Sequence, residues 1–113
     1  MLTLAEIDNF KGVLLREKAE LTESDTASAD DRSPVKLDQQ AVGRLSRMDA
    51  MQQQAMANAA SNRRAARITR IDAALRRMDE AEFGFCLDCG DDIGTARLFL
   101  DPTVPNCVSC AAG

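Results

Sequence analysis

Four cysteines arranged as two Cys-x-x-Cys pairs constrain this chain more than any other feature. The pairs are Cys86/Cys89 and Cys107/Cys110, and seventeen residues separate them. Each pair places two thiolates on one tight turn, and a spacer of hairpin length lets the second turn fold back to complete a tetrahedron. The pattern predicts one structural zinc ion held by all four cysteines, since the chain has no histidine to serve as a ligand.

Three other uses of these cysteines are considered. Disulfides of a secreted domain are disfavoured because no signal-like segment opens the chain and no cysteine precedes Cys86. A thioredoxin-like redox centre needs a strand-to-helix turn, and nothing upstream has the pattern of a strand. Iron shares the ligand count, so an iron site stays open, although the polar spacer with Asp91, Asp92 and Arg97 favours zinc.

No catalytic constellation is evident. A closed four-cysteine site leaves no coordination position for water or substrate, so the metal is expected to hold structure. The chain also lacks histidine, a nucleophile–base pair and a glycine-rich phosphate loop. We therefore expect that the protein is not an enzyme.

Composition limits the classes of partner. Four Phe and no Trp or Tyr give little aromatic mass for a core, so stability must come from helix packing and the metal. The formal charge of −4 would become −6 with four thiolates and one Zn²⁺, which disfavours binding to a phosphate backbone. No run of eighteen apolar residues exists, so a soluble, cytoplasmic protein without a membrane partner is expected.

Helical periodicity organises the residues before the cysteines. Residues 2–22 carry apolar side chains at helical spacing, and Thr3 followed by Glu6 is a capping-box pattern at the start. A polar, Ser-rich and acidic stretch predicts a loop over about residues 23–37. Leu37–Glu82 is rich in helix formers and predicts a second helix of roughly forty residues.

An apolar stripe is expected along the second helix, drifting around its axis instead of keeping a strict heptad. Its members are Ala41, Leu45, Met48, Ala55, Ala59, Ile68, Ile71, Leu75 and Met78. Two helices joined by one loop most simply run antiparallel. The predicted fold is mostly α, with an antiparallel two-helix coiled-coil hairpin over residues 1–82 and a small four-cysteine zinc finger over residues 83–113.

Charge is distributed unevenly along the expected hairpin. Acidic residues gather at its tip, namely Asp25, Asp30, Asp31 and Asp38. Arginines lie nearer the cysteines, namely Arg63, Arg64, Arg67, Arg70, Arg76 and Arg77. Such runs are either solvated surfaces or binding surfaces for a charged partner.

The segment Phe83–Leu98, together with Pro102 and the second cysteine pair, resembles the zinc finger of the DksA/TraR family of bacterial transcription regulators. The likeness extends beyond the cysteines to Gly84-Phe85, Cys89-Gly90, Ile93-Gly94 and Arg97-Leu98. The order of parts, a coiled coil followed by a finger, is also similar. The resemblance implies a protein that binds RNA polymerase, inserts its coiled coil into the secondary channel and alters promoter complexes without contacting DNA.

The resemblance also implies partner-binding residues, at the tip and near the base of the coil. The candidates are Asp30, Asp31, Asp38, Ala41, Arg63 and Arg70. The family's tip motif, Asp-x-x-Asp-x-Ala, is absent, and its nearest counterpart is Asp38-Gln-Gln-Ala41. Asp101 stands where members that respond to guanosine tetraphosphate carry a basic residue, which argues against a site for that nucleotide.

The leading hypothesis is an RNA polymerase-binding regulator. The alternative is a zinc-stapled helical adaptor that binds another protein and does not act on RNA polymerase. Sequence-specific DNA binding through the finger is disfavoured, because residues 83–113 contain four Asp and a single Arg.

Overall fold

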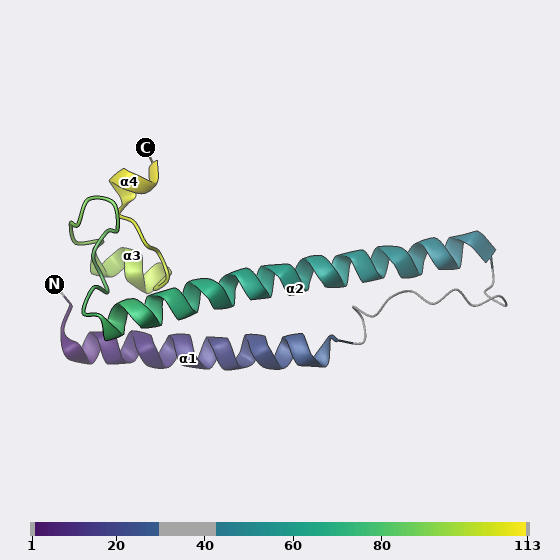
Figure 1. Cartoon of the computed structure of the whole chain (residues 1–113), viewed down its shortest axis with the longest axis horizontal. Coiled ribbons are helices and arrows are strands. Elements are labelled where there is room, and N and C mark those ends of the chain that lie inside the picture. The colour runs from purple at the N-terminus through teal and green to yellow at the C-terminus, as the bar shows by residue number, and fades with distance from the viewer. Residues whose placement is uncertain (1, 30–42, 113) are drawn as a thin grey trace. The chain divides into compact units, whose positions relative to one another are not determined.

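The computed structural model describes residues 2–29 and 43–112, and these residues form four helices. The helices are α1 (Leu4–Ala27), α2 (Gly43–Asp79), α3 (Thr95–Leu100) and α4 (Val108–Ala112) (Figure 1). Within the described ranges the only β-type pairing is an isolated antiparallel bridge between Phe85 and Asp92. The predicted mostly helical fold class, two long helices followed by a four-cysteine cluster, is confirmed. None of the described helices combines the length and apolarity needed to cross a membrane.

The start of α1 is a capping box. The Thr3 backbone N–H donates to Glu6 Oε1 at 3.1 Å, and the Glu6 N–H donates to Thr3 Oγ1 at 3.1 Å. These bonds satisfy two backbone donors that the first helical turn leaves unpaired. The capping pattern read from the sequence is therefore confirmed.

The end of α1 differs from the prediction. A loop was expected from Glu23, but the helix continues through Ala27. Ser, Thr and Asp are weak helix formers, yet here Asp25 Oδ1 accepts a hydrogen bond from Ser61 Oγ at 2.8 Å and pairs with Arg64 Nη2 at 3.2 Å. Contacts with α2 thus override the local preference for a loop. The rest of the predicted tip loop and the predicted helix start at Leu37 lie mainly outside the described residues.

By contacts the chain divides into two compact units. The first comprises Met1–Ala19 and Ile68–Gly113, and the second comprises Glu20–Arg67. In the first unit Lys18 Nζ lies 2.7 Å from Asp72 Oδ1, and in the second Arg64 pairs with Asp25. The α1 residue that comes earlier in the chain, Lys18, meets the later α2 residue, Asp72, and the later α1 residue, Asp25, meets the earlier α2 residue, Arg64, as antiparallel helices require. The division at residues 82 and 83 stays a prediction.

The apolar stripe on α2 is confirmed in the first unit only. There Ile71 is fully buried, and Ile68, Leu75 and Met78 are half-buried. In the second unit Met48, Ala55 and Ala59 are exposed, and the half-buried positions of α2 are Ala50, Gln54, Ala57, Ala60, Ser61, Arg64 and Arg67. Positions 54, 57, 61 and 64 continue the alternating spacing of three and four residues set by positions 68, 71, 75 and 78. The inward face of α2 therefore keeps a heptad pattern, and the expected drift of that face around the helix axis is wrong. The face turned inward is the one that carries the polar partners of Asp25. Ala41 and the Leu45 side chain lie outside what the structure describes.

A small core joins α1 to the finger in the first unit. Phe10 and Leu14 from α1 are 2% and 0% exposed, and Leu98 from α3 is 0% exposed. The Phe10 ring lies 5.8 Å from the Phe83 ring and 5.0 Å from the Phe99 ring, measured between centroids. Three of the four Phe in the chain therefore concentrate at one place. This cluster supplies the aromatic packing that fixes the finger against α1.

Helix α2 ends three residues before the predicted Glu82, in a Schellman motif. The Glu82 N–H donates to the Arg77 carbonyl at 2.8 Å, and the Ala81 N–H donates to the Met78 carbonyl at 3.3 Å. Ala81 holds φ at +60°, the left-handed conformation that this motif requires. A residue with a Cβ atom pays for that conformation with about 1–2 kcal/mol.

Substitution of Ala81 by glycine is therefore expected to stabilise the protein. Relief of the left-handed strain outweighs the larger entropy of the unfolded glycine chain, for a net gain of about 0.5–1 kcal/mol. Ala55→Gly, at an exposed position inside α2, should instead destabilise by about 1 kcal/mol. Urea denaturation followed by circular dichroism measures both. Equal destabilisation by the two variants would contradict the left-handed conformation assigned to Ala81.

The polar contacts of Asp25 give a second measurable effect. Asp25→Ala and Arg64→Ala should each cost about 1 kcal/mol, and the double variant should cost less than their sum, because they remove the same interaction. The exposed Asp49 offers a control, since Asp49→Ala should change stability by less than about 0.5 kcal/mol. Additive losses in a double-mutant cycle would show that the two side chains act independently.

Candidate metal centre

The first cysteine pair lies on a short hairpin. Ile93 N–H donates to the Gly84 carbonyl at 2.8 Å, and Cys86 N–H donates to the Asp91 carbonyl at 2.8 Å. The turn closes with a bond of 2.9 Å from the Gly90 N–H to the Cys86 carbonyl. Gly90 has φ +78°, a conformation that glycine adopts without strain, which explains the Cys-Gly step. The turn places Cys86 and Cys89 on the same side.

The second pair begins at the N-terminus of α4. The Ala111 N–H donates to the Cys107 carbonyl at 2.9 Å, so one helical turn brings Cys107 and Cys110 together. The two pairs are tied by a bond of 2.9 Å from the Leu87 N–H to the Pro105 carbonyl. Arg97 Nε donates to the Asn106 carbonyl at 3.1 Å and holds the approach to the second pair.

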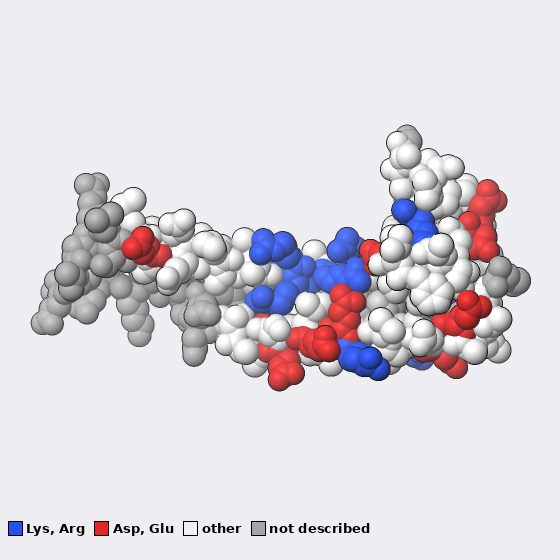
Figure 2. Space-filling model, turned by 180° about the vertical axis from the view of Figure 1, so that it is seen from behind, with Lys and Arg blue, Asp and Glu red and all other residues white. Residues whose placement is uncertain are grey.

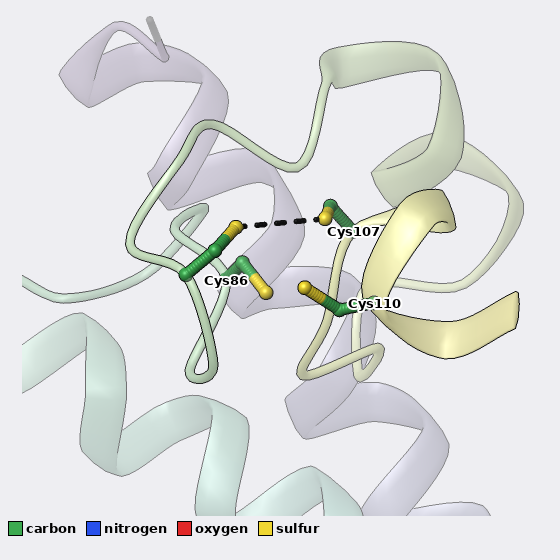
Figure 3. A group of neighbouring side chains, drawn as sticks. Cys86, Cys107 and Cys110 are labelled. Atoms are coloured by element: carbon green, nitrogen blue, oxygen red, sulfur yellow. Dashed lines mark hydrogen bonds between the residues drawn. The ribbon is translucent and has the colours of Figure 1, made fainter. Parts of the chain in front are cut away.

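The four sulfur atoms form one cluster. All lie within 4.8 Å of one another, and Cys89 Sγ and Cys107 Sγ are 3.7 Å apart. Figure 3 shows Cys86, Cys107 and Cys110 directed toward a common centre, and the dashed line marks the Cys89–Cys107 contact. A regular tetrahedron with Zn–S distances of about 2.3 Å has sulfur–sulfur edges of about 3.8 Å. The cluster therefore has the dimensions of a tetrahedral thiolate site, and all four thiols are free of disulfides.

The thiols differ in acidity. Burial raises the pKa of Cys86, but backbone N–H groups of Cys107, Cys89 and Asp88 outweigh it and lower the pKa to about 6. Hydrogen bonding with the other three sulfurs raises the pKa of Cys110 above its usual range. Four thiolates so close together repel one another unless a cation neutralises them, so metal binding must release protons.

A buried arginine links α2 to the finger. Arg77 is only 9% exposed, and its Nη2 donates to the Thr103 carbonyl at 3.4 Å. Burial, and next the charge of Arg76, lower the pKa of Arg77. Thr103 is held by Asp101, whose Oδ1 accepts from the Thr103 N–H at 3.0 Å and from its hydroxyl at 2.7 Å. In the sequence Arg77 is one arginine among several, and nothing local marks it as buried, because its burial depends on where the finger packs.

The other predicted site residues are placed only in part. Arg63 and Arg70 are exposed on α2, as a binding surface requires. Figure 2 shows basic side chains gathered over the middle of that helix. Asp25, expected at an open acidic tip, lies in α1 and is paired with Arg64, so that expectation is wrong. Four further candidates lie outside the described residues, namely Asp30, Asp31, Asp38 and Ala41.

Comparisons with known proteins agree with this architecture. Residues 81–113 match the family model described as the prokaryotic dksA/traR C4-type zinc finger. The structure of transcription factor DksA2 from Pseudomonas aeruginosa matches with a TM-score of 0.78 and 25% identity, over 96% of this chain and 82% of that chain. Residues 81–113 thus match a finger of the dksA/traR type, and the fold of the whole chain resembles that of DksA2. Together with the four-cysteine cluster, the match to a C4-type zinc finger supports zinc binding.

Two curated DksA/TraR relatives extend the comparison. The RNA polymerase-binding transcription factor DksA of Haemophilus influenzae is 42% identical over 41 residues, which are 36% of this chain and 28% of that protein. Its counterpart in Escherichia coli K12 is 37% identical over 43 residues, 38% of this chain and 28% of that protein. The aligned stretch therefore spans little more than a quarter of each of these relatives.

Proposed function

We propose that this protein binds RNA polymerase and regulates transcription initiation through the secondary channel, with one structural zinc ion held by Cys86, Cys89, Cys107 and Cys110. The observation that carries the proposal is a likeness to DksA2 over nearly the whole chain, helical hairpin included, rather than over the finger alone. The names of the curated relatives supply the partner, RNA polymerase. In this proposal the zinc ion cross-links the finger, and the chain performs no catalysis.

A competition pull-down tests the proposal. Zinc-loaded protein is mixed with purified core RNA polymerase, with and without a known secondary-channel ligand. Binding that the ligand displaces supports the channel, whereas binding that it does not displace places the contact elsewhere on the polymerase. Absence of binding would leave the alternative, a helical adaptor for another protein.

The exposed arginines of α2 are proposed to dock on an acidic surface of the polymerase. Arg63→Glu and Arg70→Glu are the informative variants, because both side chains are exposed and charge reversal leaves the fold intact. Arg47→Glu, at another exposed position of α2, is the matched control. A loss of affinity common to all three variants would point to net charge and not to a docking site.

For the tip, we expect Asp38→Asn to reduce the transcriptional effect more than the affinity for polymerase. The substitution is nearly isosteric and removes one charge, so it tests electrostatics near the polymerase active site. Asp49→Asn, on α2, should leave both quantities unchanged. In vitro transcription and a binding titration of the same samples measure the two effects. Equal loss of activity and affinity would make Asp38 a docking residue instead.

Guanosine tetraphosphate is not proposed as a ligand at Asp101. The carboxylate would repel an anion, and its Oδ1 already accepts two hydrogen bonds from Thr103. These contacts support a structural role for Asp101 in shaping the turn after α3.

A further inference from the structure

A cavity of about 270 Å³ lies in the first compact unit, and no cysteine is among its lining residues. The start of α1, the end of α2 and the lead-in to the first cysteine pair enclose it. Its walls are largely apolar and include Leu2, Leu4, Ile7, Met78, Phe83 and Phe85. Asp92 is the one charged residue among its lining.

The segments that supply these walls are acidic. Residues 2–10 contain two carboxylates and no Lys or Arg. Residues 78–92 contain six carboxylates and no Lys or Arg, namely Asp79, Glu80, Glu82, Asp88, Asp91 and Asp92. Figure 2 shows several acidic side chains, with fewer basic ones, at the end that carries the finger. Carboxylates thus outnumber cationic side chains in the segments that line the cavity, which favours a cationic partner over an anionic one.

The size of the cavity bears on its occupant. Pockets for small molecules commonly measure about 300–1,000 Å³, so this one is at or below the lower limit. It has room for a large apolar side chain, and its rim is accessible because Leu4 is 83% exposed. A hydrophobic anchor surrounded by complementary charges is a common pattern in protein recognition.

We propose that this cavity is a docking site for a basic segment of a partner protein. A leucine-like or phenylalanine-like side chain of the segment enters the cavity, and flanking lysines or arginines lie over the carboxylates around it. The site uses neither the arginines of α2 nor the tip of the hairpin. It therefore goes beyond the proposed polymerase contact and can be tested without polymerase.

The probe is a short peptide with a central leucine flanked by lysines, titrated into the isotope-labelled, zinc-loaded full chain and followed by NMR. Saturable shifts are expected at Leu2, Ile7 and Phe85. A peptide with glycine in place of leucine should bind at least about fivefold more weakly, because it loses its apolar burial. A peptide with glutamates in place of lysines should show no saturable binding. Equal binding of all three peptides overturns the proposal.

Variants of the protein locate the contact. Leu4→Ser should lower affinity for the leucine peptide about fivefold, since Leu4 forms the exposed wall. Leu100→Ser is the matched control, because Leu100 is 89% exposed and lies outside the cavity, and it should change affinity less than twofold. Glu80→Gln should weaken binding about two- to fivefold at low salt, and Asp49→Asn should not.

Two results would overturn the assignment. One is an equal loss of affinity in Leu4→Ser and Leu100→Ser, which would indicate nonspecific apolar contact. The other is a concentration-dependent dimer that Leu4→Ser dissociates, measured by sedimentation, which would assign the cavity to a second copy of this chain.

Discussion

Replacement of Cys89 by alanine is expected to abolish stable zinc binding and to unfold the finger while leaving much of the helical hairpin formed. Cys89 Sγ lies 3.7 Å from Cys107 Sγ within the cluster, so its loss opens one vertex of the tetrahedron. Structural zinc contributes folding free energy of about 10 kcal/mol or more in small zinc peptides. The finger has few buried apolar side chains to replace the folding free energy that zinc contributes. Its large buried apolar residues are Phe83, Ile93 and Leu98.

Two measurements check this expectation. Elemental analysis should give one zinc per chain for the unsubstituted protein and substantially less for Cys89→Ala. NMR signals of Ile93 and Leu98 should lose dispersion, whereas helical circular dichroism should fall only in part. Ser109→Ala is the control, because Ser109 is exposed between Cys107 and Cys110 without being a ligand in the proposed site. A folded finger in Cys89→Ala without metal would contradict a structural role for zinc.

Features that depend on neighbouring residues in the sequence could be predicted at their correct positions. The Cys-x-x-Cys spacing fixes two turns, and the Thr3/Glu6 pattern fixes the start of α1, because the interacting groups lie within a few residues of each other. The end of α2 was misplaced by three residues because Ala81 adopts a left-handed conformation that the sequence, with alanine instead of glycine there, does not signal.

Features set by distant contacts could not be predicted in the same way. The last turns of α1 depend on Ser61 and Arg64, which follow Asp25 by 36 and 39 residues. Met48 and Ala59 were predicted to face inward because they are apolar. Instead, α2 turns toward α1 the face that carries Ser61 and Arg64, which bind the Asp25 carboxylate. Burial of Arg77 likewise follows from the packing of Thr103 over α2, which no helical pattern encodes.

Phe10→Ala is expected to be the most destabilising substitution away from the cysteines. Phe10 is 2% exposed, and its ring meets Phe83 before the first cysteine pair and Phe99 on α3. Truncation of a buried Phe costs about 3–5 kcal/mol, a large share of the 5–15 kcal/mol that stabilises a typical domain. Because both contacted rings belong to the finger segment, the variant should loosen the finger from α1 as well as lower global stability.

Thermal and urea denaturation measure the loss, and zinc content separates it from damage to the metal site. Phe10→Leu keeps most of the buried volume and should cost less than half as much. Val13→Ala, at a 43% exposed position on the same helix, should cost under about 1 kcal/mol. Since Phe10 contributes no sulfur ligand, zinc should remain bound in the folded variant. A Phe10→Ala protein that kept its stability but lost its zinc would contradict this prediction. Phe10 would then support the metal site and not the stability of the aromatic cluster.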